Sequence, residues 1–411
     1  MFDVVCKSTY KLTEDRDEFL RHDGPKIHYS KDTFEGIPGI LPSGLLTDQF
    51  TLDKKPEKGI YKDVPHIFPN RNAFLPFDVF SAIFYMVSRY EEYGDFEPDR
   101  HGRFPMQQST AYELGFHKKA IVHHWSKQLI DALFGQFPTL VAEKNHTKFE
   151  IGMDIDNAYA FKHKNVFRTI GGLSLSILNP VEYINRLAVL TGNRQDPYDN
   201  YDYIFNVLSR NKTTLKTFFL CAAYGTYDKN ITPGSKVYRH LVERAKNHGE
   251  IGLHPSYASN KRATLETELK TLSELSGKPL QMSRQHFLML NFPKTYEALL
   301  KAGIKHDYSM GYAESAGFRA GIAVPFPFYN VKEDKTTDLI IHPFVFMESC
   351  YIHYQAIDID EIKAEISAMI DEVKSVNGIF HAVWHNEYFG GKGGEKWKEL
   401  FEYMLEQGST T

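Results

Sequence analysis

The sequence predicts an α/β fold: a distorted (β/α) barrel of seven strands, preceded by an N-terminal α+β domain. Two observations predict it. From residue 148 onward, short apolar runs with a period of two alternate with helical patterns, which is typical of parallel α/β proteins. Polar residues follow several of these runs, as expected where the carboxyl ends of barrel strands form one face. We expect the N-terminal domain over 1–146 and the barrel over 147–411.

Composition excludes several classes of protein. A net charge of −4 lacks the basic excess that nucleic-acid binding requires. The three cysteines show no pairing pattern, which indicates a reducing compartment. No apolar run approaches the length of a membrane span, and the first residues lack the apolar core of a secretion signal. We therefore expect a cytoplasmic protein without a membrane span, whose oligomeric state the sequence does not indicate.

The N-terminal domain is predicted to combine short strands and helices. Residues 1–60 are rich in Lys, Asp, Gly and Pro and are expected to form short strands and loops. Phe80, Phe84 and Val87 recur at helical spacing and predict an amphipathic helix, and a second helix is predicted over 119–137. Three charged residues after the first helix are expected on a solvated face: Arg89, Glu91 and Glu92.

The barrel elements follow from the alternation of patterns. Strands are predicted over 148–157, 214–223, 250–254, 280–290, 304–310, 339–346 and 378–385. Helices are expected over 235–247, 264–275, 295–302 and 358–375, with a mostly helical insertion over about 160–212. Asp358 and Glu361 give the last of these helices a capping-box start. The acidic loop Asp196–Asp202 in the insertion is expected either as a solvated turn or as a binder of sugar hydroxyls.

Asp154 and Asp156 are two residues apart in the first predicted barrel strand. Their side chains are therefore expected to point the same way from its carboxyl end. Two neighbouring carboxylates repel each other, and burial raises the cost. A bound cation or one shared proton would offset that repulsion. The alternative is a solvated strand end that caps the next helix.

Ionisable side chains gather at or near the ends of later strands: His254, Arg284, His286, Asp307 and His385. Carboxylates and imidazoles without a cysteine cluster suit a divalent cation, Zn²⁺ among others. Such a metal would polarise a carbonyl and lower the pKa of a bound water. With a carboxylate as base and a histidine as acid, the pattern predicts metal-assisted hydrolysis of an amide or ester.

Residues 148–390 resemble the polysaccharide deacetylase domain, the NodB-homology fold of carbohydrate esterase family four, in the order and spacing of their motifs. The matching segments are Met153-Asp-Ile-Asp-Asn157, Lys216-Thr-Phe-Phe-Leu220, Asn247-His-Gly-Glu-Ile-Gly-Leu-His254 and Ala382-Val-Trp-His385, with Arg284 at the arginine motif and Asp307 near the fourth motif. The N-terminal region, together with the segments 250–257, 307–314 and 317–321, resembles an uncharacterised deacetylase-like subgroup found in surface-polysaccharide contexts.

The resemblance implies a role for each matching residue. These roles are Asp154 as catalytic base, Asp156 and His254 as metal ligands, Arg284 as the group that orients the base, His385 as the acid, and Asp307 as a further member of the catalytic group.

This chain also departs from the family. Ala258 stands where the family has a third ligand, a histidine. His286 shares the parity of Arg284 and is the replacement ligand predicted here; Asn260, Glu387 or a water are alternatives. Because the two aspartates are spaced by two rather than adjacent, an exchange of base and ligand stays open.

The expected activity is metal-dependent removal of N- or O-linked acetyl groups from a sugar or polysaccharide intermediate, as in envelope polysaccharide biosynthesis. The partner would then be an acetylated carbohydrate, and the cofactor a divalent ion such as Zn²⁺. Two alternatives stay open: a metal-independent amide hydrolase on the same fold, which Ala258 suggests, and a catalytically inactive carbohydrate-binding protein. The cluster of charged residues favours the metal-dependent deacetylase over the inactive binding protein, since an unused site has no physical reason to bury charge.

Overall fold

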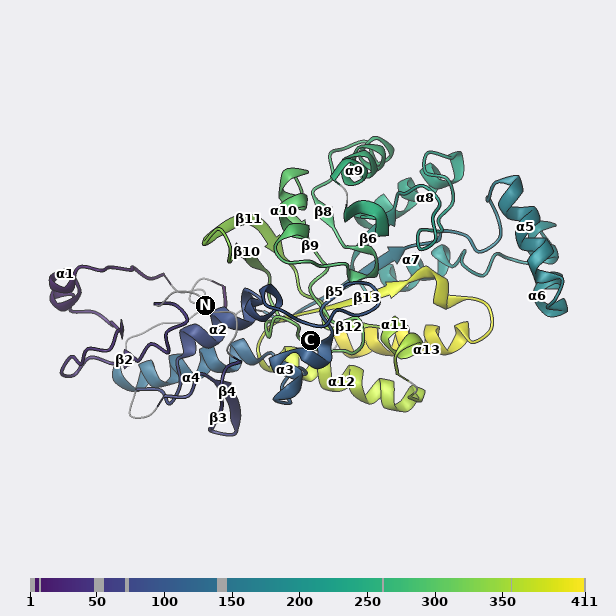
Figure 1. Ribbon diagram of the computed structural model, residues 1–411. Helices are drawn as coiled ribbons and strands as arrows, with labels where there is room; N and C mark the ends of the chain where they lie inside the picture. Colours follow the sequence, from purple (N-terminus) through teal and green to yellow (C-terminus); the bar gives the residue numbers. More distant parts are fainter. Residues whose placement is uncertain are drawn as a thin grey trace.

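The computed structural model describes residues 4–6, 9–47, 55–70, 74–138, 146–260, 262–355 and 357–409 (Figure 1). The segment 139–145, where the N-terminal domain is expected to end, lies outside the described residues. The boundary between the two domains therefore stays a prediction. No helix among these described ranges is long and apolar enough to cross a membrane.

A mixed sheet with parallel strands at its centre organises the larger part of the molecule. Its nine strands within the described ranges lie in the order β10-β11-β9-β8-β7-β6-β5-β13-β12. They are β5 (Lys148–Ile155), β6 (Thr214–Leu220), β7 (Gly249–His254), β8 (Met282–Ser283), β9 (His306–Asp307), β10 (Phe326–Asn330), β11 (Lys335–Ile341), β12 (Phe346–Met347) and β13 (Ile379–His385). All neighbours pair parallel except β10 with β11.

The predicted seven-stranded barrel is wrong in its closure and in its strand count. Over the described residues the sheet is open, with β10 and β12 at its edges. Strand β10 falls in a region expected to be a loop, and it pairs antiparallel. The strand predicted over 280–290 is reduced to the two residues of β8, and positive φ angles of 58° at Phe287 and 51° at Leu288 end the extended chain that follows it.

Helices pack beside the sheet and complete its core. They are α7 (Tyr201–Arg210), α8 (Lys236–Lys246), α9 (Arg262–Ser276), α10 (Lys294–Lys301), α11 (Ser349–His353), α12 (Ile359–Ser375) and α13 (Gly394–Ser409). The capping box of α12 is confirmed: Asp358 accepts from the amides of Asp360 and Glu361, and Glu361 accepts from the amide of Asp358. Helix α13 was not predicted, although Leu400, Phe401, Met404 and Leu405 are buried at helical spacing.

The N-terminal part contains the two predicted helices and two small sheets. Its elements are α1 (Arg16–Arg21), β1 (His28–Tyr29), β2 (Gly39–Ile40), β3 (Lys58–Tyr61), β4 (Val64–Ile67), α2 (Val79–Val87), α3 (Thr110–Glu113) and α4 (Ile121–Gln136). The side chain of Asp78 caps the start of α2 by accepting from the amide of Ser81. The described residues of 1–60 contain the expected short strands and loops, and also helix α1, which was not expected.

The solvated face expected at Arg89, Glu91 and Glu92 is wrong. Arg89 is 0% exposed and Glu92 is 5% exposed. The Nε atoms of Arg89 and Arg319 donate to Glu92 Oε1 at 2.7 and 2.9 Å, and the guanidinium of Arg89 also donates to the Arg319 carbonyl. Buried opposite charges compensate one another, and the partner Arg319 lies far away in the sequence. This network joins the N-terminal part to the region that carries the sheet.

A second ionic contact between the same two parts predicts a pH-dependent stability. Glu372 of α12 accepts from Lys119 Nζ at 2.9 Å, from the Ala120 amide at 2.9 Å and from His124 Nε2 at 2.7 Å. Burial raises the pKa of Glu372, but these hydrogen bonds and charges outweigh it and lower the pKa to about 2 from 4.5. The stabilisation is therefore present above about pH 4.5 and is lost as the pH falls towards 2.

Glu372→Gln is expected to lower the free energy of unfolding at pH 7 by roughly 1–3 kcal/mol. It should also flatten the pH dependence of unfolding below pH 4.5. Urea unfolding at a series of pH values measures both effects, with exposed Glu406→Gln as the control. An unchanged pH dependence in the Glu372 variant would contradict this assignment.

Candidate metal centre and active site

Asp154 and Asp156 lie at the carboxyl end of β5, in the middle of the parallel strands. Asp154 is 2% exposed and pairs in register with His385 of β13. Its Oδ1 accepts from Arg284 Nη1 at 2.6 Å, whereas its Oδ2 lies 3.9 Å from His254 Nε2 and 4.0 Å from His385 Nε2. The expected common direction of the two carboxylates is met, because His254 and His385 lie near both of them.

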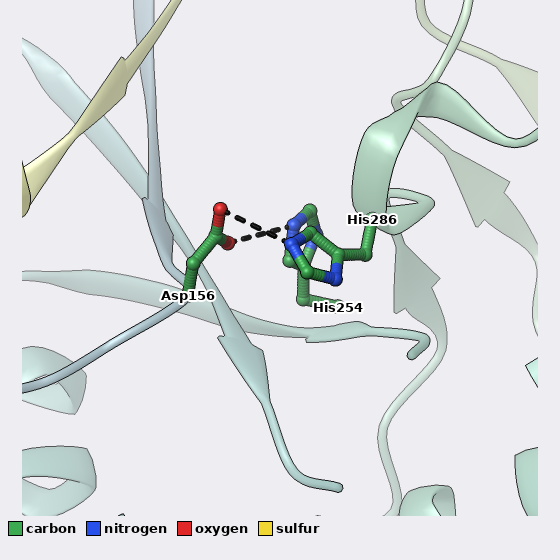
Figure 2. A group of neighbouring side chains, drawn as sticks. All are labelled: Asp156, His254 and His286. Carbon is green, nitrogen blue, oxygen red and sulfur yellow. Dashed lines mark ion pairs between the residues drawn. The ribbon is translucent and has the colours of Figure 1, made fainter. Parts of the chain in front are cut away.

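Asp156, His254 and His286 form a compact group of potential metal ligands (Figure 2). Asp156 Oδ1 lies 3.0 Å from His254 Nε2, and Asp156 Oδ2 lies 3.3 Å from His286 Nε2. One ligand atom from each residue lies within 4.8 Å of the others. Two imidazoles and one carboxylate from separate segments of the chain therefore converge on one point.

Hydrogen bonds on the far side of each ring orient the two histidines. His254 Nδ1 donates to the backbone carbonyl of Arg284 at 2.6 Å, and His286 Nδ1 donates to Asp228 Oδ1 at 3.0 Å. Both Nε2 atoms are thereby directed at Asp156. Metal-binding histidines are typically held in this way, by an acceptor on the nitrogen that does not bind the metal. Asp228 was not found from the sequence, because it lies in the loop after β6, where no periodicity marks it.

His286 reaches the group by a different route from the one predicted. Strand β8 ends at Ser283, so strand parity with Arg284 does not position the ring. The His286 amide instead donates to the carbonyl of Pro255, and His286 begins a short 3₁₀-helix (His286–Leu288). This turn brings His286 beside His254, with ring centres 5.1 Å apart.

The neighbouring side chains favour the ionised form of the Asp156 carboxylate. Burial raises the pKa of Asp156, but the neighbouring His286 and His254 outweigh burial and hold the pKa well below its usual range. Burial lowers the pKa of His286, but the charge of Asp156 and the bonds to Asp156 and Asp228 raise it to about 9. Asp156 is thus ionised at neutral pH, the state in which a carboxylate binds metals.

Arg284 is completely buried and holds Asp154 in place. Its Nε donates to the carbonyl of Tyr308 at 3.0 Å, and its Nη2 donates to His381 Nε2 at 2.5 Å. The guanidinium also lies over the ring of Phe218, 4.3 Å from its centre. Burial lowers the pKa of His381 to about 4, so this ring is a neutral acceptor. His381 therefore supports the site from within the sheet.

Glu348 orients His385 and was not found from the sequence. The carboxylate of Glu348 is buried, and its Oε1 accepts from His385 Nδ1 at 2.8 Å and from the His385 amide at 2.5 Å. Burial lowers the pKa of His385, but the charge of Glu348 and this hydrogen bond outweigh it and raise the pKa to about 10. His385 is therefore protonated, with its Nε2 directed at the two aspartates.

The remaining predicted residues lie outside this group or at its margin. Asp307 accepts from the hydroxyls of Ser283 and Ser309 at 2.9 Å, and none of its described hydrogen bonds reaches Asp154 or Asp156. A catalytic role for Asp307 stays a prediction, and its contacts fit a structural role.

Of the two alternative protein ligands, the structure describes the side chain of Glu387 but not that of Asn260. Burial and the charge of Asp156 raise the pKa of Glu387 to about 7. Ala258 offers no ligand atom, and the side chain of Asn260 lies outside the described part of the chain.

Asp196, at the start of the acidic loop in the insertion after β5, is not solvated. Asp196 is buried and accepts from the amides of Ala160, Phe161 and Lys162 at 2.8–2.9 Å. The solvated turn is therefore wrong for Asp196, whereas binding of sugar hydroxyls by the loop stays a prediction. The loop fixes the path of the chain as it leaves the candidate site.

A loop of the N-terminal part contacts the turn that carries His286. Arg103 Nη1 donates to the carbonyl of Phe287 at 2.8 Å, directly after His286. The ring of His101 lies 4.9 Å from that of Phe287 and 5.7 Å from that of Tyr227. The N-terminal part therefore supports the turn that carries His286.

Comparisons with known proteins cover the two parts of the chain separately. A family of unknown function, DUF7033, matches residues 1–138. No curated protein sequence matches the chain.

Similar solved structures cover about 64% of this chain. They include a putative polysaccharide deacetylase from Mycobacterium smegmatis (12% identity, TM-score 0.41, 64% of this chain and 85% of that one) and a probable polysaccharide deacetylase from Pseudomonas aeruginosa PAO1 (9%, 0.41, 63% and 84%). Another is a CE4 family pseudoenzyme from Bacillus anthracis (8%, 0.31, 64% and 63%). Proteins described as polysaccharide deacetylases are thus among the structures that this chain resembles, and the case for an activity depends on its own side chains.

Proposed function

We propose that the protein is a metal-dependent hydrolase that removes N- or O-linked acetyl groups from a sugar or polysaccharide intermediate, as in envelope polysaccharide biosynthesis. One observation carries the proposal. The Nε2 atoms of His254 and His286 face the carboxylate of Asp156, while both Nδ1 atoms are bound elsewhere. Beside this group lie a carboxylate held by an arginine and a histidine held by a glutamate.

The donor set fits a divalent ion such as Zn²⁺. In a tetrahedral site with bonds of 2.0–2.1 Å, neighbouring ligand atoms lie about 3.3 Å apart. The two nitrogen–oxygen distances to Asp156 are 3.0 and 3.3 Å, and Asp156 Oδ1 makes no hydrogen bond to a described residue. A bound ion would polarise the acyl carbonyl of the substrate and lower the pKa of a water molecule.

The division of roles between the two aspartates follows from their partners. Asp156 belongs to the histidine group, whereas Asp154 Oδ1 is held by Arg284. Asp154 Oδ2 carries no hydrogen bond from Arg284 and is free to accept a proton from the attacking water. This arrangement supports Asp154 as the base and Asp156 as the ligand, rather than the exchanged assignment.

His385 is suited to act as the acid. Its Nδ1 donates to Glu348, and its Nε2 lies 3.8 Å from Asp156 Oδ2 and 4.0 Å from Asp154 Oδ2. A pKa of about 10 keeps the ring protonated until a leaving amine or alkoxide accepts the Nε2 proton. Glu348 would act through His385 as a positioning residue.

Metal content tests the ligand assignment. Untagged protein loaded with Zn²⁺ is expected to bind about one equivalent by elemental analysis. His254→Ala and His286→Ala should each weaken binding by about 10- to 100-fold or more, because each removes a donor from a three-residue set. His240→Ala, which changes an exposed histidine on α8, is the control and should bind like the wild type.

Acetate release tests the reaction. The wild-type protein is expected to release acetate from an N- or O-acetylated oligosaccharide, and chelation of the metal should abolish release. Release that survives chelation would favour the metal-independent hydrolase. Glycan binding without any release, by protein that holds its metal, would favour the inactive binding protein.

A further inference from the structure

The helical hairpin formed by α5 (Val166–Ser176) and α6 (Pro180–Leu190) projects from the body of the molecule (Figure 1). It carries half of the large apolar side chains that are exposed over the described residues. They are Val166, Phe167, Ile170, Leu175, Ile177, Leu178, Val181, Ile184 and Leu187. Phe167 is 88% exposed and Leu178 is 93% exposed. So dense an apolar surface marks a contact with another apolar phase.

The hairpin is an ordered surface with its own internal packing. The helices approach closely: a Cβ at Gly172 of α5 would lie 2.2 Å from Arg186 Nη1 of α6. The Arg186 guanidinium lies 4.5 Å from the centre of the Phe161 ring. Arg168 donates to the carbonyls of Lys229 and Asn230 at 2.6 and 2.8 Å, which attaches α5 to the loop after β6. The apolar side chains are therefore presented on a supported scaffold.

The charge of the hairpin differs from that of the chain as a whole. The hairpin together with the four residues on either side of it (162–194) contains five cations and one anion: Lys162, Lys164, Arg168, Arg186 and Arg194 against Glu182, which pairs with Arg186 at 3.0 Å. Five minus one leaves a local charge of +4, in a chain whose net charge is −4. Helices with an exposed apolar face and basic flanks are typical of segments that lie in the interface of an anionic membrane.

We propose that this hairpin docks on a membrane surface that contains anionic lipid, with Phe167, Leu178 and their apolar neighbours entering the boundary between headgroups and acyl chains. A second copy of the chain is the less suitable occupant. A two-fold interface places the same patch on both sides, and two copies of the segment 162–194, each of charge +4, would repel each other. Anionic lipid satisfies the apolar surface and the charge together.

Docking would also bring the candidate site near the membrane. The hairpin follows Asp156 closely in the chain, and Asp196 holds the segment that leads into it. Resting on the proposed function, this position suits a substrate whose sugar is carried by a lipid. The docking itself is independent of catalysis.

Vesicle flotation with the full-length protein tests the proposal without an activity readout. Phosphatidylcholine vesicles are compared with vesicles that also contain phosphatidylglycerol, at low and high salt. We expect binding to the anionic vesicles that weakens as salt screens the basic residues. The double variant Phe167→Ser, Leu178→Ser should bind about 100-fold more weakly, or worse, because it removes two large apolar side chains from the contact.

The matched control is the double variant Leu12→Ser, Ile60→Ser, which removes two side chains that are 82% and 68% exposed in the N-terminal part. It should bind like the wild type. Both variants change exposed positions, so circular dichroism should show an unchanged fold. Absence of binding, equal loss in the control, or equal binding to both kinds of vesicle would overturn the proposal. A dimer in sedimentation that only the hairpin variant loses, without vesicle binding, would assign the face to a second copy.

Discussion

Asp154→Asn is expected to lower the rate of acetate release by about 10²- to 10⁴-fold, the usual contribution of a general base. The amide retains the shape of the carboxylate but cannot accept the proton of the attacking water. Asp154 lies outside the histidine group, so the variant should still bind its metal. Acetate release and metal content, measured on the same sample, separate the two roles.

The informative comparison is Asp156→Asn, which is expected to lose metal as well as activity because Asp156 faces both histidines. Exposed Asp131→Asn on α4 controls for the loss of a negative charge. If Asp154→Asn lost the metal while Asp156→Asn kept it, the base and ligand assignments would have to be exchanged.

Gly152→Ala is expected to disable the site indirectly, by displacing Arg284, without changing any reacting group. A Cβ at this position would lie 2.3 Å from Arg284 Nη2 and 2.4 Å from Nη1, so the guanidinium must move. Arg284 would then lose its bond to Asp154 or to His381. We expect kcat to fall about 10- to 100-fold, with less change in KM, because a charge-assisted hydrogen bond to the base is lost. Stability should fall by about 1–3 kcal/mol from overpacking.

Gly135→Ala is the matched control. Gly135 lies inside α4 with no atom within 4 Å of an added Cβ, so the exchange should be neutral or slightly stabilising. Steady-state kinetics and urea unfolding of both variants measure the effects. Wild-type kinetics in the Gly152 variant would mean that Arg284 does not position Asp154.

Several site residues could be predicted from the sequence because their directions follow from the strands that carry them. Residues two apart on a strand share a face, and the carboxyl ends of parallel strands meet at one edge. These two rules were enough to bring together Asp154 of β5 and Asp156 just after it, His254 of β7 and His385 of β13. Periodicity failed for the region 280–290, where the pattern extended a strand through Phe287 and Leu288, whose φ angles are positive.

What the sequence by itself determined was the group of strand ends on which the chemistry depends. Apart from Arg284, which the family resemblance assigned to the base, only the tertiary structure decided which groups orient the site residues. Asp228 behind His286 and Glu348 behind His385 come from segments outside the parallel strands. Arg319 likewise forms a buried ionic network with Glu92, where the sequence predicted a solvated face. The reason is physical: periodicity reports the direction of a side chain along its own segment, whereas hydrogen-bond partners from distant segments are fixed only when the chain packs.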